Sequence, residues 1–172
     1  GAKPKRTILF IGFAGEEFGL LGAQAWVKAH KDKLPKIANL FNRDGGPEPP
    51  VGISVPQAMY DDFVKISEPI QKIRPDYPFE VKVREPRKRP TRMGGTDASV
   101  FAIEGVPTLG FTTEDFKGYD FDYGEIWHTE RDLYTKNIPE YQEHTATVTA
   151  IIALGVANLD KQLSREGLYT EE

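Results

Sequence analysis

The chain has 172 residues, of which 39% are hydrophobic and 28% charged. That length corresponds to roughly one domain, and the composition is typical of a globular protein rather than a disordered one. A net charge of −4 argues against a general nucleic-acid-binding protein. No apolar run approaches the roughly 18 residues of a membrane span. Because there is no cysteine, disulfides, thiol nucleophiles and thiolate metal sites are excluded.

The N-terminal part of the sequence predicts strands alternating with helices. Residues 7–14 form a nearly continuous apolar run, which is typical of a strand buried on both faces. Residues 18–30 have a helical pattern, and residues 36–41 form a second short apolar run that predicts a strand. This run ends at the turn signal NRDGGP, residues 42–47.

The central part continues the alternation. Residues 51–55 predict a short strand, and Pro56 can open a helix that extends to about Lys72. Residues 79–83 alternate like an exposed strand. A loop rich in proline, arginine and glycine follows over residues 85–95.

In the C-terminal part, Asp97 can cap a short helix through Glu104, and residues 106–111 predict a buried strand. Residues 112–129 form a long loop, a feature that is usually functional in compact domains. Pro139 opens a helix with a long apolar stripe. The alternation predicts one α/β domain with a largely parallel sheet. Because a buried first strand needs neighbours on both sides, we expect this sheet to lack some strands.

Two adjacent acids, Glu16 and Glu17, follow the first predicted strand at its carboxyl end, the edge where open α/β sheets bind ligands. Adjacent carboxylates repel each other unless a cation or a shared proton compensates. One of them can bind a metal ion while the other accepts a proton from a metal-activated water. The alternative is a helix N-terminus, where acidic side chains interact favourably with the helix dipole.

Asp44 and His128 also lie at the ends of predicted strands or loops. Asp44 is alternatively a turn aspartate before Gly45 and Gly46. His128 closes the long loop, and a loop histidine is either a metal ligand or an ordinary surface residue. The other histidines lie on predicted helices, where we expect them to be solvated or partly packed. Glu, Asp and His together form a carboxylate-rich ligand set for one or two zinc ions.

A basic stretch lies between residues 82 and 92, with three prolines and no interleaved aromatic residues. Its cations are Lys82, Arg84, Arg87, Lys88, Arg89 and Arg92. We interpret the stretch as solvated loop surface and expect no nucleic-acid partner. One of its arginines can bind a substrate carboxylate through two hydrogen bonds.

Residues 6–10 (RTILF) and 14–23 (AGEEFGLLGA) resemble the signature of the zinc aminopeptidase family. That family includes bacterial leucyl aminopeptidases, glutamate carboxypeptidase II, carboxypeptidase Q and glutaminyl cyclase. Three further segments match it in the same order: the predicted strand ending at Asp44, residues 94–107, and Trp127-His128-Thr129 through Asp132. The helix from Pro139 resembles the closing helix of the family, so the resemblance spans nearly the whole chain.

The resemblance implies a three-layer α/β/α sandwich with a mixed, mostly parallel sheet, in which residues 1–172 are the C-terminal portion of the catalytic domain. It implies exopeptidase activity, with Glu16 as general base, Glu17 and His128 as ligands of one zinc ion, and Asp44 as a ligand of a second. Candidate substrate-binding residues are Asp97, Tyr119 and Tyr123. The implied substrate is a peptide, and the implied location is secreted or periplasmic.

Two departures from the family pattern qualify this expectation. The family's remaining ligands, a histidine and a bridging aspartate, precede the acidic pair on a segment that is not in this sequence. Ala98 stands where many members carry histidine. We therefore expect this chain to bind zinc weakly and to have little or no activity. Two alternatives remain open: a non-catalytic, receptor-type binding module with the same fold, and a glutaminyl cyclase-like acyltransferase.

Overall fold

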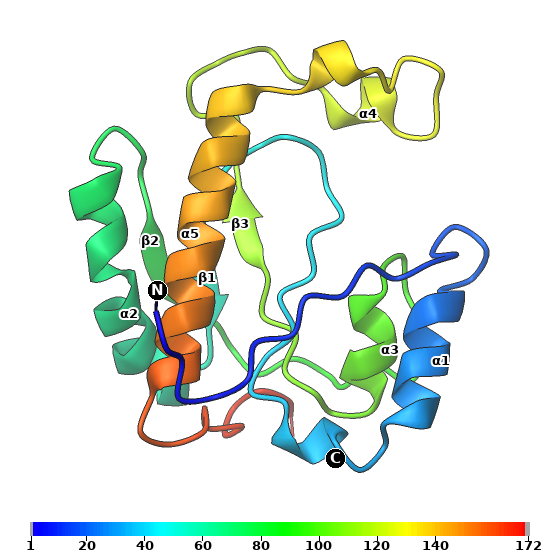
Figure 1. The fold of residues 1–172 in the computed structure, drawn as a ribbon, viewed down its shortest axis with the longest axis vertical. Helices are drawn as coiled ribbons and strands as arrows, with labels where there is room; N and C mark the ends of the chain where they lie inside the picture. Colours follow the sequence, from blue (N-terminus) through cyan, green and yellow to red (C-terminus); the bar gives the residue numbers. More distant parts are fainter. Residues whose placement is uncertain (1, 171–172) are drawn as a thin grey trace.

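The computed structural model describes residues 2–170 (Figure 1). Its strands are β1 (Pro50–Val55), β2 (Glu80–Val83) and β3 (Phe111–Thr113). Its α-helices are α1 (Leu21–Ala29), α2 (Tyr60–Ile73), α3 (Ala98–Ile103), α4 (Tyr123–Ile126) and α5 (Pro139–Asn158). Short 3-10 turns lie at Leu34–Lys36, Gln57–Met59 and Tyr134–Lys136. Within the described part of the chain, no helix is long and apolar enough to cross a membrane.

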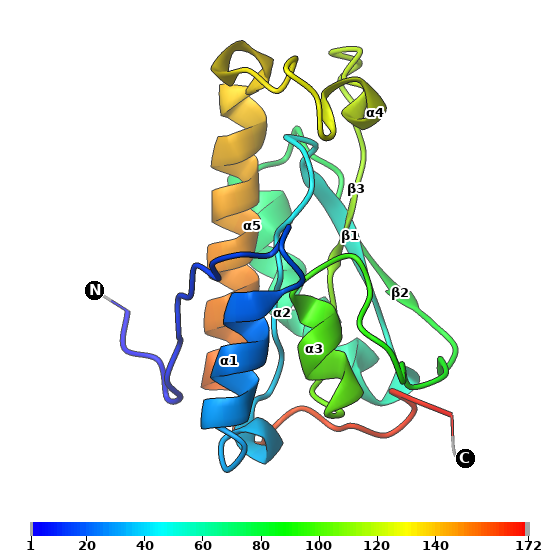
Figure 2. The same ribbon diagram turned by 90° about the vertical axis from the view of Figure 1, so that its right-hand side faces the viewer.

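The three strands form one mixed sheet in the order β2-β1-β3. β1 runs parallel to β2, with Val55 opposite Val83, and antiparallel to β3, with Ile53 opposite Phe111. The predicted strands at 51–55 and 79–83 are confirmed, as is the α/β class. Figures 1 and 2 show α5 running alongside α2, and both helices contact the sheet.

The largest core lies between α2, α5 and the sheet. α5 begins with Pro139 at its first turn, where the missing N–H of proline costs no hydrogen bond. Its buried stripe packs against α2 and β1, and the fully buried residues of this core include Ile53, Val55, Phe63, Ile70, Val148 and Ile152. The predicted helices at 56–72 and from Pro139 are therefore confirmed, and their apolar stripes are the surfaces that pack.

A second core joins α1 to α3. Ala23 and Val27 of α1 pack with Val100 and Phe101 of α3, and Trp26 lies beside the Phe101 ring at 5.4 Å between centroids. Both helices were predicted, but the expected cap was not found. Asp97 precedes α3 without a capping hydrogen bond from its side chain.

The strand predicted at 7–14 is wrong. In the described structure this run is not in the sheet, and Leu9 and Phe10 are 62% and 94% exposed. Together with residues 36–43 it lines a cavity of about 760 Å³, and none of its residues pairs in a strand of the described structure. Apolar side chains favour burial, but a strand also needs hydrogen-bonding partners for its backbone.

The strands predicted at 36–41 and 106–111 also differ from the structure. Residues 38–41 lie beside residues 107–109 without forming a ladder. Leu40 N–H donates to the Pro107 carbonyl at 2.9 Å, and the Asn39 amide both donates to and accepts from the Leu109 backbone, at 3.1 and 2.8 Å. The side chain of Asn39 thus replaces a backbone partner, and regular pairing starts only at Phe111.

Three arginines of the basic stretch form hydrogen bonds to neighbouring segments of the protein. Arg89 donates to the Ile103 carbonyl through Nε at 2.9 Å, Arg84 donates to the Leu168 carbonyl at 3.4 Å, and Arg87 donates to the Thr108 hydroxyl at 3.2 Å. These guanidinium groups donate to two backbone carbonyls and one side-chain hydroxyl of neighbouring segments, so part of the stretch has a structural role.

Candidate functional site

Glu16 and Glu17 lie in a tight turn that leads into α1. The N–H groups of Gly19 and Leu20 both donate to the Glu16 carbonyl, at 2.9 and 2.8 Å. Leu20 has a φ of 59°, and a Cβ on Gly22 would lie 2.6 Å from the Ala14 nitrogen, so the close crossing requires glycine there. The first turn of α1 contains no acidic residue. Glu16 and Glu17 therefore lie outside the first turn of α1, where the helix dipole acts most strongly, which makes the helix-dipole alternative less favourable.

The structure brings Glu17 and His128 together. His128 Nε2 lies 3.1 Å from the Glu17 carboxylate, although the two residues are 111 positions apart. His128 follows α4 and has a φ of 57°, a left-handed conformation that is uncommon for residues other than glycine. Both side chains are more than half exposed. A strained, exposed histidine facing a glutamate is typical of a functional constraint rather than of packing.

Three more carboxyl groups belong to the same region. Burial raises the pKa of Glu16, and the charges of Asp44, Glu17 and Asp97 raise it further. Burial and the charge of Glu17 raise the pKa of Asp44. Burial and the charge of Asp44 raise the pKa of Asp97. The carboxylates predicted from the sequence thus raise one another's pKa, with His128 opposing this at Glu16, and they form an electronegative region in which a cation would favour their charged forms.

Asp97 is the most buried member of this group. The residue is 8% exposed, and its buried Oδ1 has no hydrogen-bond partner among the described residues. An unpartnered buried carboxylate oxygen is unfavourable by itself. Because the charge of Asp44 also raises its pKa, Asp97 is electrostatically coupled to a predicted site residue, which favours a role in the site over a role in the fold.

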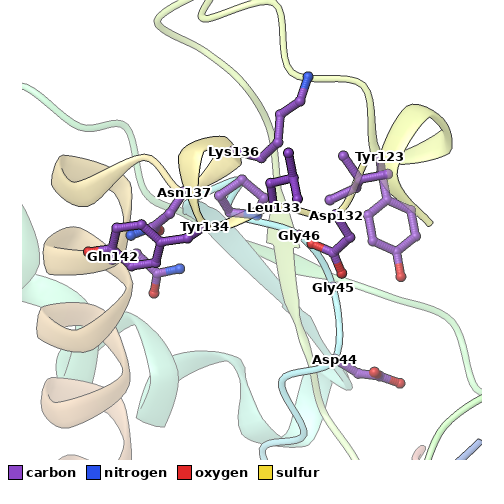
Figure 3. Close-up of a pocket in the computed structure, with 12 residues that line it drawn as sticks. Asp44, Gly45, Gly46, Tyr123, Asp132, Leu133, Tyr134, Lys136, Asn137 and Gln142 are labelled. Carbon is purple, nitrogen blue, oxygen red and sulfur yellow. The ribbon is translucent and has the colours of Figure 1, made fainter. Parts of the chain in front are cut away.

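A cavity of about 400 Å³ opens next to Asp44 (Figure 3). Its other lining residues come from the segment after Asp44, from α4, from the residues that precede α5 and from α5 itself: Gly45, Gly46, Pro47, Tyr123, Ile126, Asp132, Leu133, Tyr134, Lys136, Asn137 and Gln142. Tyr123 was predicted from the sequence. Tyr119 was also predicted but does not line this cavity, and its hydroxyl donates to the Glu140 carboxylate on α5.

Sequence reasoning missed the wall formed by Leu133, Tyr134, Lys136 and Asn137. The available signal was their position in the sequence. They form the short connection between the Trp127-His128 motif and the helix from Pro139, so they cannot lie far from His128. Lys136 is held by Glu125, with 3.2 Å between Nζ and Oε2.

The sequence pattern of peptidase family M28 matches residues 1–152. The chain belongs to peptidase family M28. This M28 chain is 24% identical to carboxypeptidase Q of Mus musculus over 170 residues, which are 96% of the chain and 32% of that protein. It is 50% identical over 42 residues to a probable zinc metalloprotease of Pyrenophora tritici-repentis, covering 24% of the chain and 10% of that protein.

Solved structures show the same fold. The peptidase M28 precursor from Shewanella amazonensis SB2B superposes with a TM-score of 0.70 at 26% identity, covering 95% of this chain and 34% of that one. An aminopeptidase from Aneurinibacillus sp. strain AM-1 superposes with a TM-score of 0.51 at 17% identity, covering 90% of this chain and 34% of that one. The M28 chain thus spans about a third of the length of these relatives.

The donor set of the M28 chain fits zinc in its chemistry. Glu17 and His128 offer a carboxylate oxygen and an imidazole nitrogen within 3.1 Å of each other, and zinc prefers such ligands. No three His, Asp or Glu side chains between residues 2 and 170 are close enough together to form a metal-binding group. Asp44 lies in the same electronegative region but outside the Glu17–His128 pair.

Proposed function

We propose that this chain contributes to the catalytic centre of a zinc-dependent exopeptidase, with Glu17 and His128 as zinc ligands and Glu16 as general base. The observation that supports this most is the 3.1 Å contact between Glu17 and His128. It joins the two motifs that carry the resemblance to zinc aminopeptidases, and Glu16 is adjacent in the same turn.

Each carboxylate has a proposed role. Glu17 and His128 would hold one zinc ion, and Asp44 would be a ligand of a second. A bound zinc ion supplies a Lewis acid that polarises water and the peptide carbonyl. Glu16 accepts the proton of the attacking water and returns it to the leaving amine. The raised pKa of Glu16 suits this exchange, because a base with a higher pKa holds the proton more firmly.

The proposed substrate is a peptide, bound with its terminal residue in the cavity beside Asp44, where Tyr123 forms part of the wall. Asp97 and Tyr119 remain candidate substrate-binding residues. Relatives named carboxypeptidase and aminopeptidase support exopeptidase activity, and the end of the peptide that is cleaved stays open. A secreted or periplasmic location, implied by the resemblance, is part of the same proposal.

The retained Glu16 favours an enzyme over a receptor-type binding module, because a module that only binds has no use for a proton acceptor beside metal ligands. A glutaminyl cyclase-like reaction would use similar groups, so the test must separate cyclisation from hydrolysis.

The test measures the rates of hydrolysis and of cyclisation by the zinc-saturated chain. Its substrates are aminoacyl anilides, N-blocked dipeptides and peptides with N-terminal glutamine. We expect slow release of the terminal residue, and Glu16→Gln should lower its rate about 100-fold. Glu68→Gln, which changes an exposed acid on α2, should leave the rate unchanged. Equal rates in the wild type and Glu16→Gln, or cyclisation without hydrolysis, would contradict the proposal.

A further inference from the structure

A buried hydroxyl on α5 is bonded to the loop that leads to His128. Tyr141 lies in the first turns of α5 and is fully buried. Its hydroxyl donates to Asp115 Oδ1 at 2.6 Å and accepts from the Lys117 N–H at 3.0 Å. Burial and the bond to Asp115 raise its pKa to about 12, so the hydroxyl remains a donor at neutral pH.

Asp115 in turn shapes the loop. Its Oδ1 also accepts from the Tyr119 N–H at 3.0 Å, and its Oδ2 accepts from the Phe121 N–H at 3.3 Å. The loop turns through left-handed residues at Gly118 and Asp120, with φ values of 70° and 57°. The Asp115 carboxylate, oriented by Tyr141, is therefore the common acceptor for the backbone of residues 115–121.

The far end of this loop touches the site. A Cβ on Gly46 would lie 2.7 Å from two ring carbons of Phe121 and 3.1 Å from the Tyr123 ring. Gly46 follows Asp44 by two residues, and Gly46, Tyr123 and Asp44 line the same cavity (Figure 3). The loop thus packs directly against the segment that carries Asp44.

Tyr123 also connects the loop to His128 through the backbone of α4. It opens α4, where the Trp127 N–H donates to the Tyr123 carbonyl at 2.9 Å, and His128 is the next residue. In Figure 1 the chain runs from β3 past one end of α5 and across to α4. The His128 and Glu17 side chains are more than half exposed, so little packing around them fixes their positions. The distance between them therefore depends on where the backbone places each residue.

We propose that Tyr141 is a positioning residue for this site: by orienting Asp115, it fixes the loop of residues 115–122 and thereby the placement of His128 relative to Glu17 and Asp44. The inference rests on the proposed function only for what His128 binds. The placement itself is a property of the metal-free chain.

The test uses Tyr141→Phe, with Tyr77→Phe as the matched control. Tyr77 is also fully buried and belongs to the same aromatic cluster, with its ring centroid 6.3 Å from that of Tyr141. Its hydroxyl donates to Glu140, at 3.3 and 3.4 Å, and interacts with the side chain of Lys117, but it does not contact Asp115. Both variants remove one buried hydroxyl, so a general loss of stability affects both.

In the metal-free chain, we expect Tyr141→Phe to shift or broaden the NMR signals of the His128 ring and to speed exchange of the Phe121 amide about tenfold. Tyr77→Phe should leave both as in the wild type. Asp115→Asn, a near-isosteric change at the other end of the bond, should reproduce the effect of Tyr141→Phe. Unchanged His128 signals in Tyr141→Phe, or equal changes in Tyr77→Phe, would overturn the inference.

Zinc titration then separates the two proposals. If the wild type binds zinc, Tyr141→Phe should raise the dissociation constant about tenfold, whereas Tyr77→Phe should leave it unchanged. Equal dissociation constants in Tyr141→Phe and the wild type would overturn the inference. If the wild type binds no zinc, the proposed function fails, and the metal-free NMR comparison still decides the role of Tyr141.

Discussion

Glu16, Asp44 and Asp97 carry their negative charges at a cost to the folded chain. Each has a raised pKa, first because of burial and then because of the negative charges nearby. Functional sites commonly retain such unfavourable groupings, because a ligand relieves them. The site should therefore lower the stability of the metal-free protein at neutral pH.

Asp97→Asn tests this at the residue scale. The folded-state pKa of Asp97 is raised above its unfolded value of 3.8, so the folded chain holds this proton more firmly and loses stability as the pH rises through that range. Removing the charge should raise the free energy of unfolding by about 1 kcal/mol at pH 7. Urea denaturation at pH 7 and pH 3 measures the effect.

At pH 3 the carboxyl group is largely protonated, and the gain should disappear. Asp32→Asn, at an exposed position, serves as the control and should have little effect at either pH. A loss of stability in Asp97→Asn at pH 7, or the same gain at pH 3, would contradict the account.

The contact between Glu17 and His128 was predictable, because each belongs to a motif that ends a strand-like segment or a long loop. That Glu16 and Asp44 belong to one site with them stays a prediction. The roles of these residues in zinc binding and proton transfer stay predictions. The burial of Asp97 and the wall formed by Tyr134 and Asn137 were not predictable, since both depend on how distant segments pack.

At the scale of elements, α2 and α5 depend on a close approach at Gly155. A Cβ there would lie 2.9 Å from Ile66 Cγ1 and closer still to Cγ2. Gly155→Ala improves helix propensity by about 1 kcal/mol, but overpacking costs about 1–3 kcal/mol. We expect a net loss of about 1 kcal/mol in the free energy of unfolding.

A double-mutant cycle identifies the cause. In an Ile66→Ala background the clash is removed, so Gly155→Ala should become neutral or stabilising. The same loss in both backgrounds, measured by urea denaturation, would show that Gly155 matters for another reason.

His144 on α5 gives the fold a dependence on pH. The sequence placed it on a helix and led us to expect a solvated or partly packed side chain, but it is fully buried. Its Nε2 lies 3.0 Å from the Pro50 carbonyl, and its buried Nδ1 has no partner among the described residues. Burial lowers its pKa, the bond to the Pro50 carbonyl and the charge of Asp76 oppose this, and Arg74 and Lys117 lower the pKa further.

The folded chain therefore binds fewer protons than the unfolded one, and stability should fall as the pH drops below about 6.5, the pKa of an unperturbed histidine. His144→Gln keeps a donor for Pro50 but does not titrate. Unfolding free energies between pH 7.5 and 5 should fall less steeply in this variant. Equal slopes would exclude His144 as the source.

The elements that the sequence predicted correctly are those whose apolar pattern has a partner within the described chain. The helices from Pro56 and Pro139 pack on each other, and their stripes are informative for that reason. The run at 7–14 has an equally clear pattern, but its backbone has no neighbouring strand. Hydrophobicity reports a preference for burial, whereas strand formation depends on what lies beside the segment.

At the scale of the whole molecule, the site joins the two cores. Glu17 precedes α1 in the core with α3, whereas His128 lies on the connection that enters α5 in the main core. The Glu17–His128 contact is thus a bridge between parts of the chain that pack separately. A zinc ion held by this pair would stabilise the fold as well as form the site.

Calorimetric titration of zinc into the wild type, Glu17→Ala and the exposed control Glu68→Ala tests the central claim most directly. With two donors in the pair, we expect the wild type to bind weakly, with a dissociation constant above about 1 μM, which is a binding free energy weaker than about −8 kcal/mol. Glu68→Ala should bind as well as the wild type, and Glu17→Ala should lose binding. Zinc binding that survives unchanged in Glu17→Ala, or no binding by the wild type, would contradict the assignment of Glu17 and His128 as the metal ligands.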